Sequence, residues 1–142
     1  MLAEYFPGGR LVEGDGIDTF PSYRGAYVLG LHLREAVEVR SGKTQFDLLP
    51  GWYAYAGSAR GPGGVRARLG RHFRRDKRRH WHVDQLTLAA GTMFGLAIEG
   101  GSECELASRL ARSGAFEFPI GGFGSSDCRD CPSHLLGMRD SG

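Results

Sequence analysis

The residues of this chain best suited to chemistry on a charged partner lie between positions 60 and 79. Nine of the 18 Lys and Arg residues fall in this stretch, against the single acid Asp76. Clustered cations attract polyanions, because binding releases the counterions condensed on phosphates. The alternative is a solvated helix face that its charge keeps soluble. We expect a nucleic-acid interface that contains Arg60, Arg66, Arg71, Arg74, Arg75, Lys77, Arg78 and Arg79.

The carboxylate of Glu103 is a second candidate, because helix geometry places it on an apolar face. Glu103 lies three and seven residues before Leu106 and Leu110, so on a helix it shares the side that packs inward. An unpaired buried carboxylate is costly, and its expected partner is therefore an arginine or a metal ion at the edge of the core. Ser102 and Glu105 match the S-x-x-E capping box, which gives Glu105 a structural role.

Cysteines and a histidine near the C-terminus have zinc-ligand spacing. Cys128, Cys131 and His134 follow the pattern C-x-x-C-x-x-H, and Cys104 would be a fourth ligand if the tail folds back on the last helix. In a reducing compartment this spacing favours metal or free thiols over a disulfide. Packed or free cysteines are the alternative to a structural Zn²⁺.

Length and composition restrict the class of protein. The chain has 142 residues, of which 41% are hydrophobic, as expected of one globular domain. No apolar run approaches the roughly 20 residues that cross a bilayer. Met1–Gly16 also lacks the basic start and apolar stretch of a signal peptide. We therefore expect a cytoplasmic protein that does not interact with membranes.

The elements that would position these residues begin after an N-terminal arm. Residues 1–24 are predicted to be irregular, because glycines and prolines interrupt them and no periodicity survives. Residues 27–33 and 37–39 favour strands, and a turn signal follows at residues 41–43. The two strands are predicted to form a hairpin.

A third predicted strand carries two tyrosines. Residues 52–57 follow a Pro-Gly turn and are rich in aromatic residues. The two-residue period of a strand places Tyr53 and Tyr55 on one face and Trp52 on the other. The first half of the chain is therefore predicted to be a small antiparallel sheet.

The basic stretch contains an amphipathic helix over residues 65–75, because apolar residues recur every four positions from Val65 to Phe73. Arg68 and His72 fall at one margin of the apolar stripe, beside the sheet. The fold class predicted is α/β (α+β), with a small central antiparallel sheet of about three main strands flanked by helices. Its later elements are a short helix over residues 80–86, a strand over 92–98 and a helix over 103–112.

Three motifs occur together along these elements. They are G-A-Y at residues 25–27, Y-A-G at 55–57 and R-L-x-x-H at 68–72. With a glycine-rich link after the second tripeptide and E-x-x-L on a later helix, they make the chain resemble the GIY-YIG nuclease superfamily. The sequences H-W-H-V-D at residues 80–84 and F-G-S-S-D-C at residues 123–128 are similar to a stand-alone, single-domain branch of that superfamily. The resemblance implies a nuclease domain over residues 25–136, followed by a C-terminal tail over 137–142.

What the resemblance implies is an endonuclease that hydrolyses phosphodiester bonds. Tyr27 would carry a proton during attack on phosphorus, and Tyr55 would orient water or phosphate by hydrogen bonding. Arg68 would bind the scissile phosphate and the charge that develops on it. His72 would be a second basic group near that phosphate.

Glu103 would be the sole protein carboxylate on a divalent metal ion. Mg²⁺ and Mn²⁺ take oxygen ligands and keep waters, so one carboxylate is a sufficient protein anchor. Glu105 is an alternative in an ungapped comparison, because it lies only two positions away.

The spacing of the tyrosines departs from the superfamily pattern. Tyr27 and Tyr55 are 28 positions apart, which is longer than the usual compact hairpin. An excursion of the chain through residues 34–50 would explain the length without moving either tyrosine.

The predicted function is cleavage of DNA by a metal-dependent endonuclease, in a process such as DNA repair. The same residues would also make a phosphate-binding surface, so a nucleic-acid-binding module without turnover is the alternative. The sequence leaves open whether DNA or RNA is bound, which substrate shape is preferred and which proteins are partners.

Overall fold

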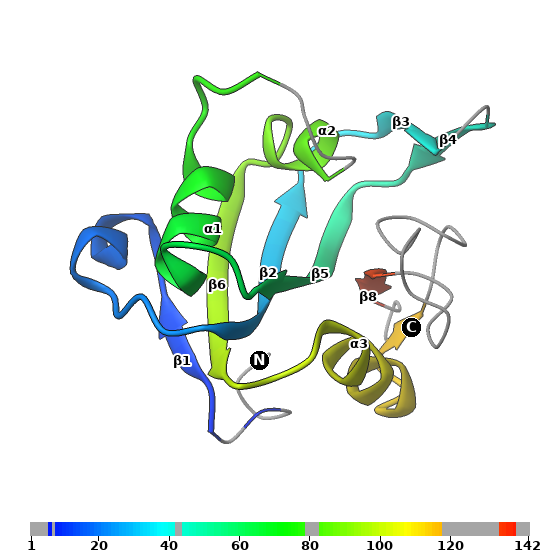
Figure 1. Ribbon diagram of the computed structural model, residues 1–142. Coiled ribbons are helices and arrows are strands. Elements are labelled where there is room, and N and C mark those ends of the chain that lie inside the picture. The colour runs from blue at the N-terminus through cyan, green and yellow to red at the C-terminus, as the bar shows by residue number, and fades with distance from the viewer. Residues whose placement is uncertain (1–5, 7, 42–43, 79–82, 118–133, 139–142) are drawn as a thin grey trace.

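The computed structural model describes residues 6, 8–41, 44–78, 83–117 and 134–138 of the chain. Its main feature is a six-stranded sheet in which every neighbouring pair of strands is antiparallel (Figure 1). Across the sheet the order is β1 (Arg10–Val12), β6 (Thr92–Glu99), β2 (Gly25–Leu33), β5 (Gly51–Ala59), β8 (Leu135–Met138) and β7 (Phe116–Glu117).

The mixed α/β class and the antiparallel sheet agree with the prediction, whereas the expected number of about three strands was too low. The three additional strands, β1, β8 and β7, have only three, four and two residues. Segments of this length show no period-2 pattern. β1 and β8 pair with the free edges of the long strands β6 and β5, and β7 then pairs with β8.

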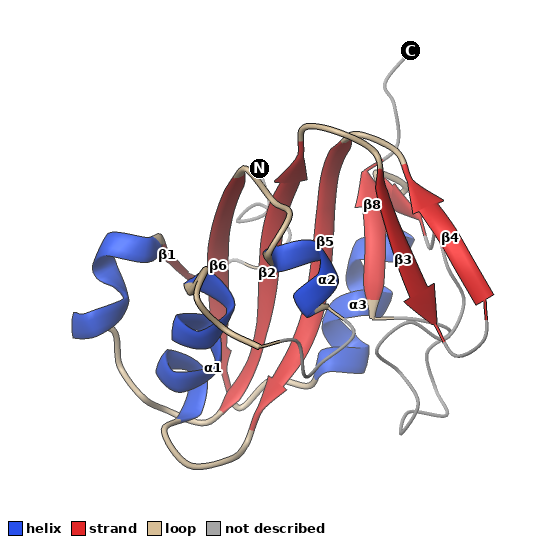
Figure 2. Ribbon diagram, turned by 90° about the horizontal axis from the view of Figure 1, so that it is seen from above, coloured by secondary structure: helices blue, strands red, loops and turns tan. Residues whose placement is uncertain are grey.

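Helices cover both faces of the sheet (Figure 2). On one face lie α1 (Gly64–Phe73) and α2 (Asp84–Thr87), together with a 3-10 helix, η2 (Gly14–Thr19). The other face packs against α3 (Glu103–Arg112). The predicted helices over 65–75 and 103–112 therefore correspond to α1 and α3. The short helix predicted over 80–86 overlaps α2 at residues 84–86, and residues 79–82 lie outside the described residues.

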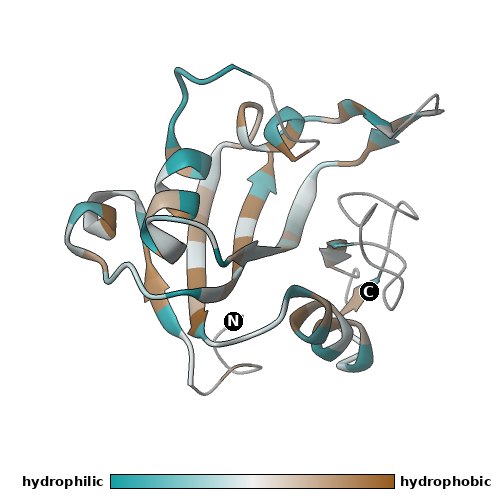
Figure 3. Ribbon diagram, in the orientation of Figure 1, coloured by the Kyte–Doolittle hydropathy of each residue, from teal (hydrophilic) through white to brown (hydrophobic). Residues whose placement is uncertain are grey.

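Alternating side chains of the central strand β2 enter two separate cores. Tyr27 and Leu29 pack toward α1 and α2, whereas Ala26 and Val28 pack toward α3. Because both faces are covered, eight of the nine positions of β2 are buried. Figure 3 shows this concentration of hydrophobic residues in β2 and β6, and hydrophilic residues along the connection from α1 to α2.

The hairpin predicted between residues 27–33 and 37–39 is wrong. β2 pairs with β5 along its full length and with β6 on its other edge, so it has no edge left for residues 37–39. Those residues begin β3 (Val37–Ser41), which pairs with β4 (Thr44–Leu48) in a separate two-stranded sheet. β2 therefore pairs with the longer apolar strand β5 and not with β3, the strand nearest to it in sequence.

The β3–β4 hairpin confirms the excursion expected between residues 34 and 50. The β2–β5 ladder continues from Leu33 opposite Gly51 to Gly25 opposite Ala59 as though the insertion were absent. The hairpin is attached to α2, where the Gln85 side-chain amide exchanges two hydrogen bonds with the backbone of Arg40, at 2.9 and 3.2 Å.

The N-terminal arm predicted over residues 1–24 contains the regular elements β1 and η2. β1 pairs with β6, and η2 packs against α1. At the other end of the chain, β8 extends past the expected domain boundary at residue 136. Among the helices that the structure describes, none combines the length and apolar character needed to span a membrane.

Candidate functional site

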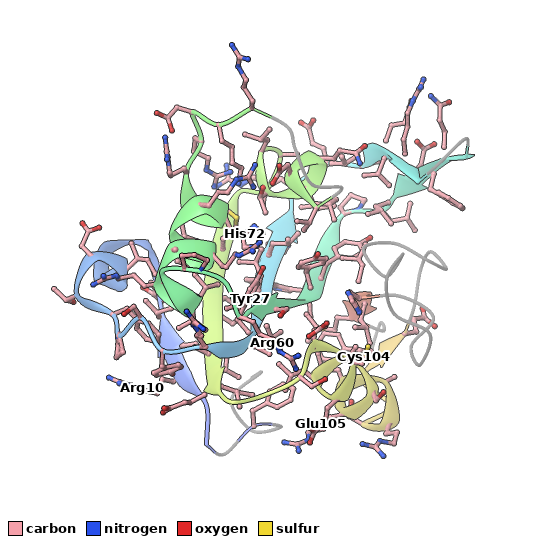
Figure 4. The ribbon with its side chains drawn as sticks, viewed as in Figure 1. Arg10, Tyr27, Arg60, His72, Cys104 and Glu105 are labelled. Atoms are coloured by element: carbon pink, nitrogen blue, oxygen red, sulfur yellow. The ribbon has the colours of Figure 1, made fainter. Side chains whose placement is uncertain are left out.

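Tyr27 of β2 and His72 of α1 are in contact beneath α1. The Tyr27 hydroxyl oxygen lies 2.6 Å from Nε2 of His72, and the ring centroids are 5.3 Å apart (Figure 4). Tyr27 is 2% exposed and His72 is 0% exposed. His72 was expected at the margin of the apolar stripe, but it is fully buried and forms part of the helix–sheet interface.

Gly57 makes room for this contact. It pairs directly with Tyr27 across the β2–β5 ladder, and a Cβ atom at position 57 would overlap the Tyr27 ring and hydroxyl. Gly25 is needed for a similar reason, since a Cβ there would overlap the backbone oxygen of Ile98. The glycines of both tripeptides therefore permit close approach of neighbouring strands.

Burial keeps the Tyr27–His72 pair uncharged. It raises the pKa of Tyr27 well above the ordinary value of 10.0, and nearby arginines oppose this rise. Burial also lowers the pKa of His72 from 6.5 to about 3, and the positive charge of Lys77 acts in the same direction. At neutral pH the phenol is therefore protonated and the imidazole neutral, and a neutral imidazole has one nitrogen that accepts a proton.

Tyr55 of β5 lies beside the same histidine. Its ring is edge-on to that of His72, with centroids 6.1 Å apart. Tyr55 pairs with Leu29, two positions along β2 from Tyr27, so both tyrosines share one face of the sheet. Burial raises the pKa of Tyr55 to about 12, and the negative charges of Asp84 and Glu103 act in the same direction.

Arg68 of α1 is the cation that acts on both tyrosines. Its positive charge lowers the pKa of Tyr27 and of Tyr55, opposing the larger effect of burial. The side chain is half-buried, and its Nη2 atom would lie 3.4 Å from a Cβ built on Gly61. The Arg68 guanidinium therefore lies close to Gly61, in the glycine-rich link before α1.

The two acids at the start of α3 differ in their surroundings. Glu103 is half-buried, and its charge contributes to the raised pKa of Tyr55 after the larger effect of burial. The Glu105 side chain is 59% exposed and forms an ion pair of 3.2 Å with Arg109. Of these two acids, Glu103 is therefore the one that belongs to the tyrosine cluster, by which we mean Tyr27, Tyr55, Arg68 and His72.

The capping box predicted for Ser102 and Glu105 is not formed. Ser102 is the N-cap residue of α3, but its side chain makes no capping hydrogen bond within the part of the chain that the structure describes. Glu105 pairs with Arg109 one helical turn further on instead of turning back toward Ser102. Competition from this i,i+4 ion pair explains the difference.

Glu103 suits a cation that needs a single protein carboxylate. Within the described residues, no three His, Cys, Asp or Glu side chains are grouped so that they could hold a metal ion. Mg²⁺ and Mn²⁺ accept such sparse ligation, because they keep several waters. Glu103 is the residue that would hold such an ion, and the metal stays a prediction.

The sequence did not single out Asp84, the acid that orders the end of α1. Asp84 is completely buried, and both of its carboxylate oxygens accept hydrogen bonds of 2.8 Å from Arg71. Lys77 donates hydrogen bonds to the carbonyl oxygens of Arg71 and His72, at 3.1 and 2.8 Å. Together they hold the last turn of α1 and, with it, His72. A lone aspartate in a short predicted helix gave no local sign of this role.

The cations of the basic stretch divide into two groups. Arg71 and Lys77 bind groups within the protein, as described, and Arg75 donates to the carbonyl oxygens of Thr87 and Ala90, at 2.8 and 2.6 Å. Arg74 makes an exposed contact of 3.4 Å with Asp76. Arg60, Arg66 and Arg78 are exposed, and Arg79 lies outside the described residues.

The predicted zinc ligands are only partly described. The Sγ atom of Cys104 lies 3.6 Å from Nε2 of His134, so strand β8 does return to α3 as expected. Cys128 and Cys131 lie outside the described residues, and the zinc site stays a prediction.

Comparison with known proteins gave one match. No curated protein and no solved structure matches the chain. The sequence model of the family described as "Domain of unknown function DUF123" matches residues 26–141, which include the tyrosine cluster, α1 and α3. The chain therefore belongs to the DUF123 family.

Proposed function

We propose that this protein is a metal-dependent endonuclease of the GIY-YIG type that cleaves the phosphodiester backbone of DNA. The observation that carries the proposal is the 2.6 Å contact between Tyr27 and His72, with Tyr55, Arg68 and Glu103 around it. These residues come from two strands and two helices, and they supply a phenol that can orient water, a phosphate-binding cation and a carboxylate.

In the proposed reaction a water oxygen attacks phosphorus and the bond to the leaving oxygen breaks. The Tyr27 hydroxyl donates a hydrogen bond to Nε2 of His72, which leaves its oxygen lone pairs to accept a hydrogen bond from the attacking water and orient it. The pKa of His72, which burial lowers to about 3, keeps Nε2 an acceptor of this hydrogen bond, while solvent takes up the proton of the water and protonates the leaving oxygen. A divalent cation held by Glu103 would supply Lewis-acid stabilisation of the negative charge.

Arg68 and Tyr55 bind the phosphate in this proposal. The planar guanidinium of Arg68 can donate two parallel hydrogen bonds to phosphate oxygens, and it stabilises the extra charge of the transition state. The pKa of Tyr55, which burial raises to about 12, keeps its hydroxyl protonated as a hydrogen-bond donor.

The test is a nuclease assay on duplex, branched and single-stranded DNA with Mg²⁺ or Mn²⁺. Tyr27→Phe and Arg68→Ala are expected to lower the cleavage rate by about 10²-fold or more. Glu103→Ala is expected to abolish cleavage, whereas Glu105→Ala, the matched control on α3, should retain it. No cleavage by the wild-type protein of any substrate with either metal would contradict the proposal, as would full activity of Glu103→Ala.

A further inference from the structure

Two arginines follow directly on the end of the β2–β5 ladder. The last pair of this ladder is Gly25 with Ala59, so Arg24 and Arg60 are the next residues beyond it on the two segments. Adjacent strands are about 4.8 Å apart. Like charges placed directly opposite destabilise a strand pair. Both arginines are exposed, so no packing requirement explains why two cations meet there.

Nearby acids do not neutralise this pair. The ion pairs among described residues belong to Arg71, Arg74 and Arg109. Glu99, the acid of β6 opposite Gly25, makes no ion pair with either arginine among the described residues; its charge raises the pKa of Tyr23, after the larger effect of burial and against the charge of Arg10. The positive charge of Arg24 and Arg60 therefore remains directed to solvent.

The pair also lies beside the proposed catalytic residues. The carbonyl oxygen of Arg24 accepts a hydrogen bond of 3.0 Å from Gly100, in the connection that leads to Glu103. Arg60 directly precedes Gly61, against which the Arg68 guanidinium lies. Figure 4 shows Arg60 near the end of β5, between Tyr27 and α3 in that view. Arg24 is thus bonded to the connection that leads to α3, and Arg60 begins the connection that leads to α1.

We propose that Arg24 and Arg60 form a phosphate clamp that binds the nucleic-acid backbone next to the phosphate held by Arg68. The proposal rests on the proposed function, because it takes nucleic acid as the partner. A polyanion relieves the repulsion between the two guanidinium groups and gains the release of its own counterions. Three cations of the basic stretch, Arg71, Arg75 and Lys77, bind protein groups. The proposed interface therefore lies nearer the end of the sheet than the sequence predicted.

The test measures binding of the full chain to labelled duplex DNA, single-stranded DNA and RNA, without divalent metal, over a series of salt concentrations. Arg24→Gln and Arg60→Gln remove one charge each at exposed positions. Each variant is expected to lower the slope of log affinity against log salt by about 0.9 for duplex DNA and about 0.7 for single strands. At 0.1 M salt this is about eightfold weaker duplex binding per variant, and about sixtyfold for the double variant, with little difference at 1 M.

The matched control is Arg112→Gln, which removes an exposed arginine from the last turn of α3. Its slope should equal that of the wild type. The thermal midpoint of the double variant should be unchanged or higher, because a repulsive pair has been removed. Arg24→Lys and Arg60→Lys should keep the slope, since they keep the charge.

The clamp is overturned if the double variant binds with the wild-type slope, or if Arg112→Gln loses as much. It is also overturned if the double variant has a lower thermal midpoint, which would give the pair a structural role, or if the wild type binds none of the probes. Wild-type protein that binds through Arg24 and Arg60 but cleaves nothing would contradict the proposed nuclease and leave the clamp standing. The preferred probe identifies which nucleic acid is the natural partner.

Discussion

Gly57 decides whether the Tyr27 ring can reach His72, although it contributes no side chain itself. Gly57→Ala is expected to displace the Tyr27 ring, because the new methyl group would overlap it. We predict a loss of about 1–3 kcal/mol in the free energy of unfolding, measured by urea denaturation, and loss of cleavage in the nuclease assay. Gly14→Ala is the control, since a Cβ there meets no atom within 4 Å. An unchanged variant at position 57 would contradict this account.

His72 makes the stability of the fold depend on pH. A histidine in an unfolded chain has a pKa of 6.5, whereas the pKa of His72 in the folded protein is about 3. Between these pH values the unfolded chain therefore holds a proton that the folded chain does not. The free energy of unfolding should therefore be fully developed above pH 6.5 and fall as the pH drops toward 3, by at most about 1.4 kcal/mol per pH unit from this residue.

Urea denaturation at pH 7.5, 5.5 and 4.5 checks this dependence. His72→Gln should show a shallower decline than the wild type, because the residue that takes up the proton on unfolding is gone. His32→Gln is the matched control, as His32 is half-buried beside Trp52 on the opposite face of β2. Equal declines in wild type and His72→Gln would show that the imidazole is not held neutral in the folded protein.

At the scale of elements, the Arg71–Asp84 pair connects α1 to α2, and its two sides are not equivalent. The Arg71 side chain is 24% exposed, whereas Asp84 is 0% exposed. Arg71→Met should cost about 3–5 kcal/mol of stability, because it leaves a buried carboxylate without its guanidinium. Asp84→Asn should cost less, since water can still reach Arg71.

Denaturation of both variants measures the asymmetry. Asp76→Asn, which removes the exposed contact with Arg74, is the control and should change stability by less than about 0.5 kcal/mol. A larger cost for Asp84→Asn than for Arg71→Met would contradict the assigned burial of the two charges.

Elements with a clear period were predictable from sequence, and pairings between distant elements were not. The apolar repeat from Val65 to Phe73 located α1 and placed Arg68 and His72 toward the sheet. The bond from Arg71 to Asp84 was not predicted, because nothing in a local pattern shows which residue 13 positions away will be buried with it. The capping signal at Ser102 was overvalued for a local reason, since Glu105 pairs with Arg109 one turn further along the same helix.

At the scale of the whole molecule, strand β8 connects the two cores. Leu135 belongs to the core beneath α1, and the next residue, Leu136, belongs to the core beneath α3. Both are 0% exposed. The four residues of β8, which follow the Cys/His motif at residues 128–134, gave no strand signal in the sequence, so only the assembled sheet reveals their place.

Leu135→Ala and Leu136→Ala should each destabilise the protein by about 2–5 kcal/mol, because each leaves a cavity in a different core. Thermal or urea unfolding measures the loss. Leu49→Ala, at a position that is 70% exposed, should be nearly neutral. A variant of either core leucine that unfolds like the wild type would show that β8 is not required to complete the cores.

Because the β2–β5 ladder is unbroken around the β3–β4 hairpin, the relative position of Tyr27 and Tyr55 depends little on the length of the connecting chain. Leu33 opposite Gly51 closes the ladder, so whatever lies between them acts as a loop whose ends are already fixed. Loop-closure entropy grows only with the logarithm of length, at about 0.6 kcal/mol for each doubling. Residues can therefore be added between positions 34 and 50 at little loop-closure cost while Tyr27 and Tyr55 keep their register, whereas removing Val39 or Leu48, which are 0% and 3% exposed, would also cost core contacts.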